Sequence, residues 1–123
     1  MKKEKLKKLL EEIEMEKRQN RYFEKVSFEE FTKGVKKNCT VELSESKIKK
    51  LYEALPYPTR STLRAGGYDF YAPYDFTLKP GETIVIPTGF KVHMNDDEIF
   101  NLFIRSGTGF KYNVRLSNQV GII

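Results

Sequence analysis

Apolar residues near the start of the chain recur with the period of an α-helix. Leu6, Leu9, Leu10 and Ile13 fall at i, i+3, i+4 and i+7. This spacing places them in one stripe along a highly charged helix of about four turns. Helices of this kind bury their stripe against other apolar surface. We therefore expect the stripe to pack within the chain or between subunits.

Two further helices are predicted before residue 57. Ser27 precedes Glu30 by three residues, which is a capping-box pattern at a helix start. The buried face of this helix should carry Phe28, Phe31 and Val35. The third helix follows Ser44, and its apolar face should carry Ile48, Leu51, Tyr52 and Leu55. Pro56 should end it, because a proline removes a backbone donor and clashes with the preceding turn.

After Thr59 the period changes from about 3.6 to 2, which is typical of β-strands. Alternating or apolar runs occur at 68–70, 84–86, 90–94, 99–104 and 114–116. Turn-forming residues separate them at 79–82 and 95–97. Short strands at this spacing predict a sandwich or barrel. We therefore divide the chain into a helical N-terminal extension, residues 1–57, and a β domain, residues 58–123.

Composition limits the class of protein. The 123 residues have room for one ordinary domain, and 39% apolar content with 13% aromatics is enough for a core. Of the net charge of +5, residues 1–58 carry +4 (15 basic, 11 acidic) and residues 59–123 carry +1 (7 basic, 6 acidic). The basic residues of the first half are interleaved with glutamates, as on a solvated helix. We therefore do not expect a nucleic-acid partner.

Cysteine and histidine content argues against two other classes. The chain has one cysteine, Cys39, and one histidine, His93, which cannot form an internal disulfide or a structural zinc site. We expect Cys39 to be a buried small residue or a free thiol, and His93 to be a strand-surface residue, not a catalytic one. No apolar stretch reaches the length of a membrane span. We expect a cytoplasmic protein with no membrane partner.

Three clusters carry possible chemistry. In the first, Gly66 and Gly67 precede Asp69 at the start of a strand. The glycines would permit a tight turn, and the carboxylate suits Mg²⁺, which prefers oxygen ligands and keeps several waters. The alternative is an ordinary glycine turn with a solvated aspartate.

The second cluster, Arg105-Ser106-Gly107-Thr108-Gly109, follows the strand predicted at 99–104. Arginine offers a planar fork for phosphate oxygens, and the serine hydroxyl and the backbone N–H groups at the glycines add donors, so a polyphosphate would fit. The third cluster is Ser117-Asn118-Gln119-Val120-Gly121. Asn118 can present a donor and an acceptor to a base edge. For the first two clusters taken alone, an ordinary turn is the more common explanation, and Asn118 could simply cap a hairpin.

In order, the three clusters resemble the motifs of the trimeric dUTPases, the dUTP nucleotidohydrolases. Residues 65–72, Ala-Gly-Gly-Tyr-Asp-Phe-Tyr-Ala, are similar to the first motif. Arg105-Ser106-Gly107 resembles the second, and residues 118–123, Asn-Gln-Val-Gly-Ile-Ile, resemble the opening of the third. The residues from Lys79 to Gly89 fit the family's connecting hairpin. The resemblance covers about residues 58–123.

The resemblance implies a jelly-roll-like β fold, here incomplete, and a homotrimer whose active sites are shared between subunits. It also implies Mg²⁺-dependent hydrolysis of dUTP to dUMP and pyrophosphate. By the same resemblance, Arg105, Ser106 and Gly107 would bind the phosphates and Asn118 the uracil edge. The backbone of Ile122 and Ile123 would help to form the nucleotide pocket, and Asp69 would orient Mg²⁺ through water.

The sequence departs from the family pattern in places. Ile104 and Thr108 replace a usual proline and leucine. The aspartate that activates the attacking water in the family would follow Ile123, so no catalytic residue is present in residues 1–123. We expect the natural chain to continue and this polypeptide alone to have little or no activity. The alternatives are a related dCTP deaminase, which Tyr68-Asp69 and Gly107 disfavour, and a catalytically silent member that binds nucleotide or a protein partner.

Overall fold

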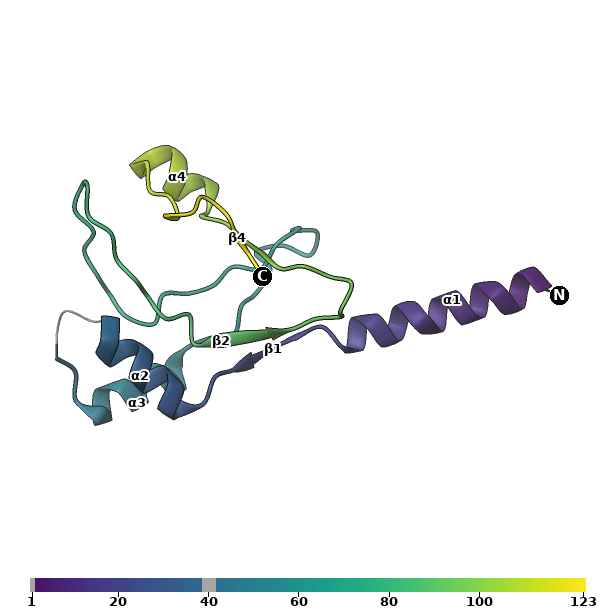
Figure 1. Cartoon of the computed structure of the whole chain (residues 1–123), viewed down its shortest axis with the longest axis horizontal. Helices are drawn as coiled ribbons and strands as arrows, with labels where there is room; N and C mark the ends of the chain where they lie inside the picture. Colours follow the sequence, from purple (N-terminus) through teal and green to yellow (C-terminus); the bar gives the residue numbers. More distant parts are fainter. Residues whose placement is uncertain (1, 39–41) are drawn as a thin grey trace. The chain divides into compact units, whose positions relative to one another are not determined.

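The computed structural model describes residues 2–38 and 42–123, so the prediction for Cys39 lies outside the described residues. Two compact units are formed: residues 23–92, here the core unit, and residues 1–22 with 93–123, here the terminal unit. The elements (Figure 1) are α1 (Lys2–Gln19), β1 (Tyr22–Lys25), α2 (Phe28–Asn38), α3 (Glu45–Ala54), β2 (Phe90–His93), β3 (Asn101–Leu102), α4 (Ser106–Tyr112) and β4 (Gly121–Ile122). The predicted division at residue 57 stays a prediction, because it rests on the kind of secondary structure and not on contacts.

Helices α2 and α3 of the core unit begin where their capping serines predict. The Ser27 Oγ accepts a hydrogen bond from the Glu30 N–H at 3.2 Å, and the Ser44 Oγ accepts one from the Lys47 N–H at 3.3 Å. Each bond satisfies a donor that the first helical turn leaves without a partner. Helix α3 ends at Ala54, ahead of Pro56. The sequence prediction is confirmed for both helices.

The hydrophobic core of the chain lies between these two helices. Its four buried hydrophobic residues are Phe31, Val35, Ile48 and Leu55. Partly buried side chains from the later part of the core unit, Tyr74 and Phe90, pack against it. Gly89 has a φ of +80°, and a Cβ placed there would lie 2.5 Å from the Leu55 Cδ2. The helical segment therefore shares one core with residues that follow Thr59.

Strand β1 was not predicted from the sequence, and it pairs with β2. Within the core unit, the Val26 N–H donates to the Gly89 carbonyl at 2.9 Å, and Lys91 forms an ion pair with Glu24 at 3.1 Å. Because the numbering of the two partners runs in opposite directions, the strands are antiparallel. The predicted strand at 90–94 is thus confirmed, with His93 as its last residue.

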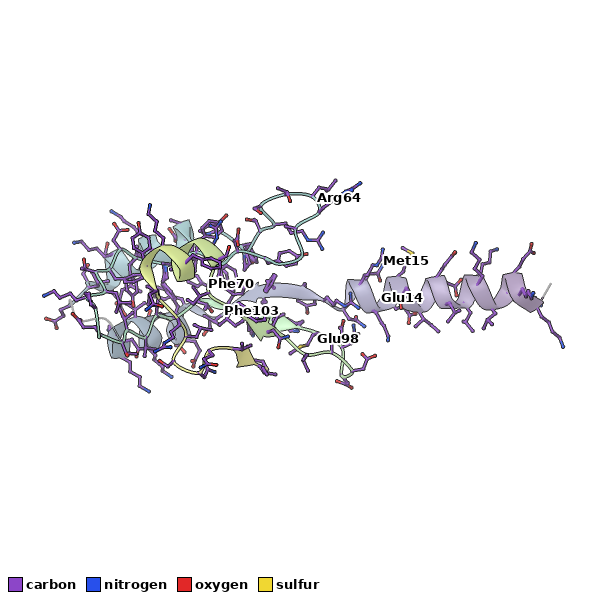
Figure 2. All side chains as sticks on the ribbon, turned by 90° about the horizontal axis from the view of Figure 1, so that it is seen from above. Glu14, Met15, Arg64, Phe70, Glu98 and Phe103 are labelled. Carbon is purple, nitrogen blue, oxygen red and sulfur yellow. The ribbon has the colours of Figure 1, made fainter. Side chains whose placement is uncertain are left out.

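Helix α1 of the terminal unit has 18 residues, about five turns, none of them buried. Figure 2 shows its side chains, including those of Glu14 and Met15, projecting on all sides of the helix. The apolar stripe remains exposed, so the expected packing within the chain is not observed among the described residues.

The C-terminal end of α1 is held by the loop that follows β2. Lys17 forms an ion pair with Asp97 at 2.9 Å, and the Asn95 side-chain amide donates to the Lys17 carbonyl at 3.0 Å. The hydrogen bond from Lys17 keeps the pKa of Asp97 below its usual value, and the same bond raises the pKa of Lys17. The pKa of Glu98 is lowered chiefly by the Asn95 backbone N–H, which donates to it at 2.9 Å.

Several predicted strands are not formed. Residues 84–86 and 114–116 are irregular, residues 68–70 contribute a single bridge, and the strand predicted at 99–104 is reduced to β3. A strand persists only when its backbone groups find a neighbouring strand, and within the described residues the runs 84–86 and 114–116 have none. The strands that do form make two two-stranded sheets, β1–β2 and β3–β4. Among the described residues, no helix is long and apolar enough to cross a membrane.

Candidate nucleotide-binding site

The first motif lies in the core unit, on an irregular segment held by one antiparallel bridge. The Asp69 N–H donates to the Thr59 carbonyl at 2.7 Å, and the Thr59 N–H donates to the Asp69 carbonyl at 3.2 Å. Phe70 and Tyr68 pack edge-on against Phe23 of β1, with ring centroids 5.4 and 5.3 Å away. The bridge fixes the backbone of Asp69, and the rings of Tyr68 and Phe70 anchor this segment to β1.

Asp69 is a half-buried residue, and no group of three or more potential metal ligands gathers around it or elsewhere in residues 2–38 and 42–123. Gly66 and Gly67 lie in the turn before it, but neither has a positive φ and neither is crowded. The backbone bends at both glycines, but neither position requires glycine for a positive φ or for a close contact. A single carboxylate suits Mg²⁺ when phosphates and water provide the remaining ligands.

The second motif lies in the terminal unit, at the start of the short helix α4, which was not predicted. Arg105 precedes the helix with extended backbone angles, and Ser106 and Gly107 form its first turn. Asn113 ends it in the left-handed conformation, φ 54° and ψ 33°, donating its N–H to the Gly109 carbonyl at 3.0 Å. Glycine disfavours helix interiors, which explains why the sequence pattern did not reveal α4.

The third motif forms a turn that leads into β4. The Gln119 N–H donates to the Leu116 carbonyl at 2.9 Å, so Asn118 lies in the turn and not at a strand edge. Strand β4 then pairs antiparallel with β3, with Gly121 opposite Leu102. A Cβ at Gly121 would lie 3.2 Å from the Leu102 Cβ, so this close pairing favours glycine.

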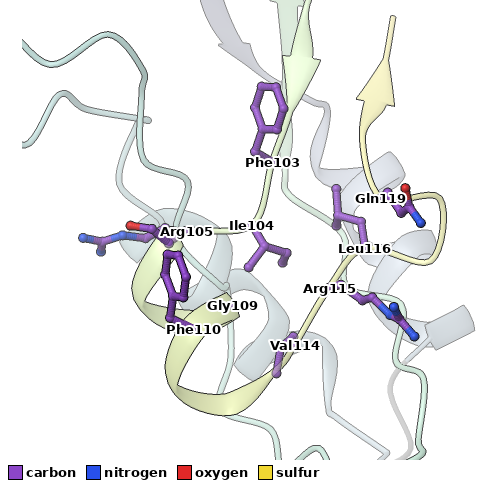
Figure 3. A pocket seen from close by; sticks show the side chains of 10 residues that line it. Phe103, Ile104, Arg105, Gly109, Phe110, Val114, Arg115, Leu116 and Gln119 are labelled. Atoms are coloured by element: carbon purple, nitrogen blue, oxygen red, sulfur yellow. The ribbon is translucent and has the colours of Figure 1, made fainter.

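The second and third motifs meet at a hollow of about 320 Å³ in the terminal unit. Its lining residues are Phe103, Ile104, Arg105, Ser106, Gly109, Phe110, Val114, Arg115, Leu116 and Gln119. In Figure 3 the side chains of Arg105 and Arg115 lie on opposite sides of it, with Ile104 and Leu116 between them. The lining thus combines apolar side chains with two guanidinium groups and contains no carboxylate, a composition that suits an anionic ligand with an apolar part.

The hollow brings together only some of the predicted site residues. Arg105 and Ser106 line it, whereas Gly107, Asn118, Ile122 and Ile123 do not. Asp69 belongs to the core unit. Sequence reasoning missed Arg115 and Phe110. The alternation of Val114 and Leu116 had set Arg115 apart as a polar position between two apolar ones, which was the available signal.

Comparisons with known proteins agree with these motifs. The sequence model of the dUTPase family matches residues 53–123. Deoxyuridine 5'-triphosphate nucleotidohydrolase of Shewanella piezotolerans is 42% identical over 71 residues, which is 55% of this chain and 47% of the relative. The enzyme of the same name from Methylococcus capsulatus is 40% identical over 77 residues, 60% of this chain and 51% of the relative. No solved structure matches significantly.

The three motifs and the family match agree. This chain belongs to the dUTPase family, which confirms the resemblance seen in the three motifs. It spans about half the length of the curated relatives that it matches. The match begins at residue 53, within α3.

Proposed function

We propose that the whole protein hydrolyses dUTP to dUMP and pyrophosphate. The observation that carries the proposal is the family match over residues 53–123, which includes all three motifs in order. The hollow adds physical support, because it combines two arginines with apolar side chains and contains no acidic residue.

Within this proposal, Arg105, Ser106 and Gly107 bind the phosphates. Arg105 and Ser106 line the hollow, and the guanidinium group forms paired, charge-assisted hydrogen bonds with phosphate oxygens. Arg115, on the other side of the hollow, adds a second positive charge. Asn118 bonds the uracil edge from its turn, and the backbone of Ile122 and Ile123 shapes the nucleotide pocket.

Asp69 is proposed to hold Mg²⁺ through bound water. When bound, the ion would neutralise charge on the triphosphate. The half-buried Asp69, without a surrounding cluster of ligands in the described chain, fits an ion that the phosphates and water mostly coordinate.

The proposed reaction is attack of water on the α-phosphorus. A new bond joins the water oxygen to that phosphorus, the bond from phosphorus to the α,β-bridging oxygen breaks, and pyrophosphate leaves with the electron pair. Such a reaction depends mostly on positioning and on charge neutralisation. Arg105 and Ser106 would position the phosphates, and Arg105 would neutralise part of their charge.

We also propose that the whole protein is a homotrimer with shared active sites. Large apolar side chains on the terminal unit support an interface there, since Phe103, Phe110 and Tyr112 are each more than 60% exposed. Assembly would cover them.

Titration of the 1–123 chain with a non-hydrolysable dUTP analogue and Mg²⁺ tests the binding step. Arg105→Ala should weaken binding by about 10-fold or more, the usual effect of losing a charged hydrogen bond. Lys111→Ala also removes one positive charge, but Lys111 lies on α4 and does not line the hollow. This control variant should therefore leave binding unchanged. Equal loss in both variants, or no binding by the native chain, would refute the assigned phosphate site.

Hydrolysis by the whole protein is tested by pyrophosphate release from dUTP. Release of pyrophosphate that requires Mg²⁺ supports the proposal. Binding of the analogue without release would instead identify a catalytically silent nucleotide-binding member. Ammonia release from dCTP would identify a deaminase.

A further inference from the structure

The apolar stripe of α1 is exposed along its length. Leu6, Leu9 and Leu10 are each more than half exposed, and Ile13 is 41% exposed. Apolar residues in one contiguous row on a soluble surface mark an interaction site. The contacts that hold α1 to the rest of the terminal unit involve Lys17 and lie beyond the end of the stripe. A partner on the stripe would leave them intact.

The charges of α1 show which partner fits. Around the point between Leu9 and Leu10, lysines on one side are mostly matched by glutamates at equal distances on the other side, although Lys2 is matched by Lys17. The matched charges beside the stripe are Lys7 with Glu12, Lys5 with Glu14 and Lys3 with Glu16. The matched apolar residues are Leu9 with Leu10 and Leu6 with Ile13. A two-fold interface requires such self-complementarity, because each helix then presents its lysines and glutamates to the other copy in reverse order.

Helical geometry places these charges where they act. With about 3.6 residues per turn, one flank of the stripe carries Lys5, Glu12 and Glu16, and the other carries Lys3, Lys7 and Glu14. In an antiparallel pair each flank faces the same flank of the other helix in reverse order. Lysines then meet glutamates on both sides.

A parallel pair would have the opposite electrostatics. Each flank would then face the other flank at the same height, so Lys5 would meet Lys3 and Lys7, and Glu12 would meet Glu14. Like charges at close range disfavour that arrangement. The charge pattern therefore selects one orientation.

We propose that α1 pairs antiparallel with α1 of a second copy of this chain. The seam consists of Leu6, Leu9, Leu10 and Ile13 from both helices, and Lys–Glu pairs lie along both flanks. The interface is separate from the nucleotide hollow, so it stands whether or not the proposed function holds.

Charge reversal in the full 1–123 chain tests the pairing. Glu12→Lys/Glu14→Lys places like charges across both flanks, so the mass measured by sedimentation equilibrium at low salt should fall about two-fold from that of the native chain. Glu4→Lys/Glu11→Lys makes the same charge change on the far side of α1 and should keep the native mass. Circular dichroism checks that both variants retain the helix.

Mixing provides a rescue. Lys5→Glu/Lys7→Glu should also have half the native mass, and an equal mixture of the two reversed chains should restore it. Equal mass in the native chain and both reversed variants would overturn the proposal, and would favour a stripe that packs within its own chain or on a different protein. Failure of the mixture to recover mass would also overturn it.

Disulfide trapping tests the orientation. In a Cys39→Ser background, Lys5→Cys and Glu12→Cys chains are mixed and oxidised. Antiparallel pairing brings positions 5 and 12 of different copies together, so the mixed disulfide should exceed either homodimer several-fold. A mixed disulfide that forms instead between Lys5→Cys and Lys7→Cys chains would show parallel pairing and refute the proposal.

Discussion

The two compact units differ in where their apolar side chains lie. The core unit contains all four buried hydrophobic residues of the described chain, on or next to α2 and α3. In residues 93–123 of the terminal unit no residue is buried, and Phe110 is 92% exposed. Burial of apolar surface is the main favourable contribution to folding. The free energy of folding therefore comes mostly from the core unit.

The two units also differ in their proposed roles, because the buried core lies in one and the hollow in the other. The hollow with Arg105 and Arg115 belongs to the terminal unit, where β3 and β4 hold the backbone by a few hydrogen bonds. Asp69 belongs to the core unit and is anchored there by aromatic contacts of its neighbours. Substitutions of the buried side chains in the core unit should accordingly affect stability most, and substitutions around the hollow should mainly affect binding.

The largest expected effect comes from emptying the core. Ile48→Ala should lower the free energy of unfolding by about 3 kcal/mol, because it leaves a cavity where the native side chain is fully buried. Phe110→Ala removes a larger but exposed side chain and should change the free energy of unfolding by less than about 0.5 kcal/mol. Urea unfolding measures both. Equal losses would contradict the contrast between the units.

Gly89 comes next. Gly89→Ala combines a positive φ with a Cβ 2.5 Å from Leu55, and should cost about 2 kcal/mol or more. Gly81 has nearly the same φ, +81°, but open space around it, so Gly81→Ala should cost about 1 kcal/mol. The difference between the two midpoints in urea isolates the close contact with Leu55. No difference would mean that Leu55 moves aside without cost.

A smaller effect is expected for Tyr52. Its hydroxyl donates to the Val26 carbonyl at 2.7 Å in a partly buried position, so Tyr52→Phe should cost about 1 kcal/mol. Tyr71→Phe removes a hydroxyl that pairs with the Thr59 Oγ1 at 2.9 Å on the surface. It should cost less, and thermal unfolding compares the two. The reverse order would show that the Val26 carbonyl finds water instead.

The smallest effect concerns the loop that holds α1. Because the pKa values of Asp97 and Glu98 are lowered in the folded chain, their contribution is present above the usual carboxylate pKa and is lost as pH falls through the folded values. The Asn95 side-chain amide resonances, followed by NMR from pH 7 to 2, should shift in that window. Asp97→Asn should remove the part of this shift that comes from the ion pair of Asp97 with Lys17. Asp96→Asn should leave that part unchanged. An unchanged profile in Asp97→Asn would refute the assigned ion pair.

The candidate site was only partly predictable. Arg105, Ser106 and Asn118 stand out because their side-chain chemistry suits phosphate and base edges, and their order along the chain matches a known family. Arg115 and Phe110 belong to no motif. They line the hollow because α4 reverses the chain at Asn113, a feature that two glycines inside the helix concealed.

The sequence by itself determined the helices α2 and α3, their capping serines, their buried faces and the family to which the chain belongs. These features depend on neighbours within about four residues or on motifs read in order. Only the tertiary structure decided which apolar runs became strands, why Gly89 must be a glycine, and which arginines share a hollow. Strand pairing and close packing join residues far apart in the chain, and local patterns carry no information about such partners.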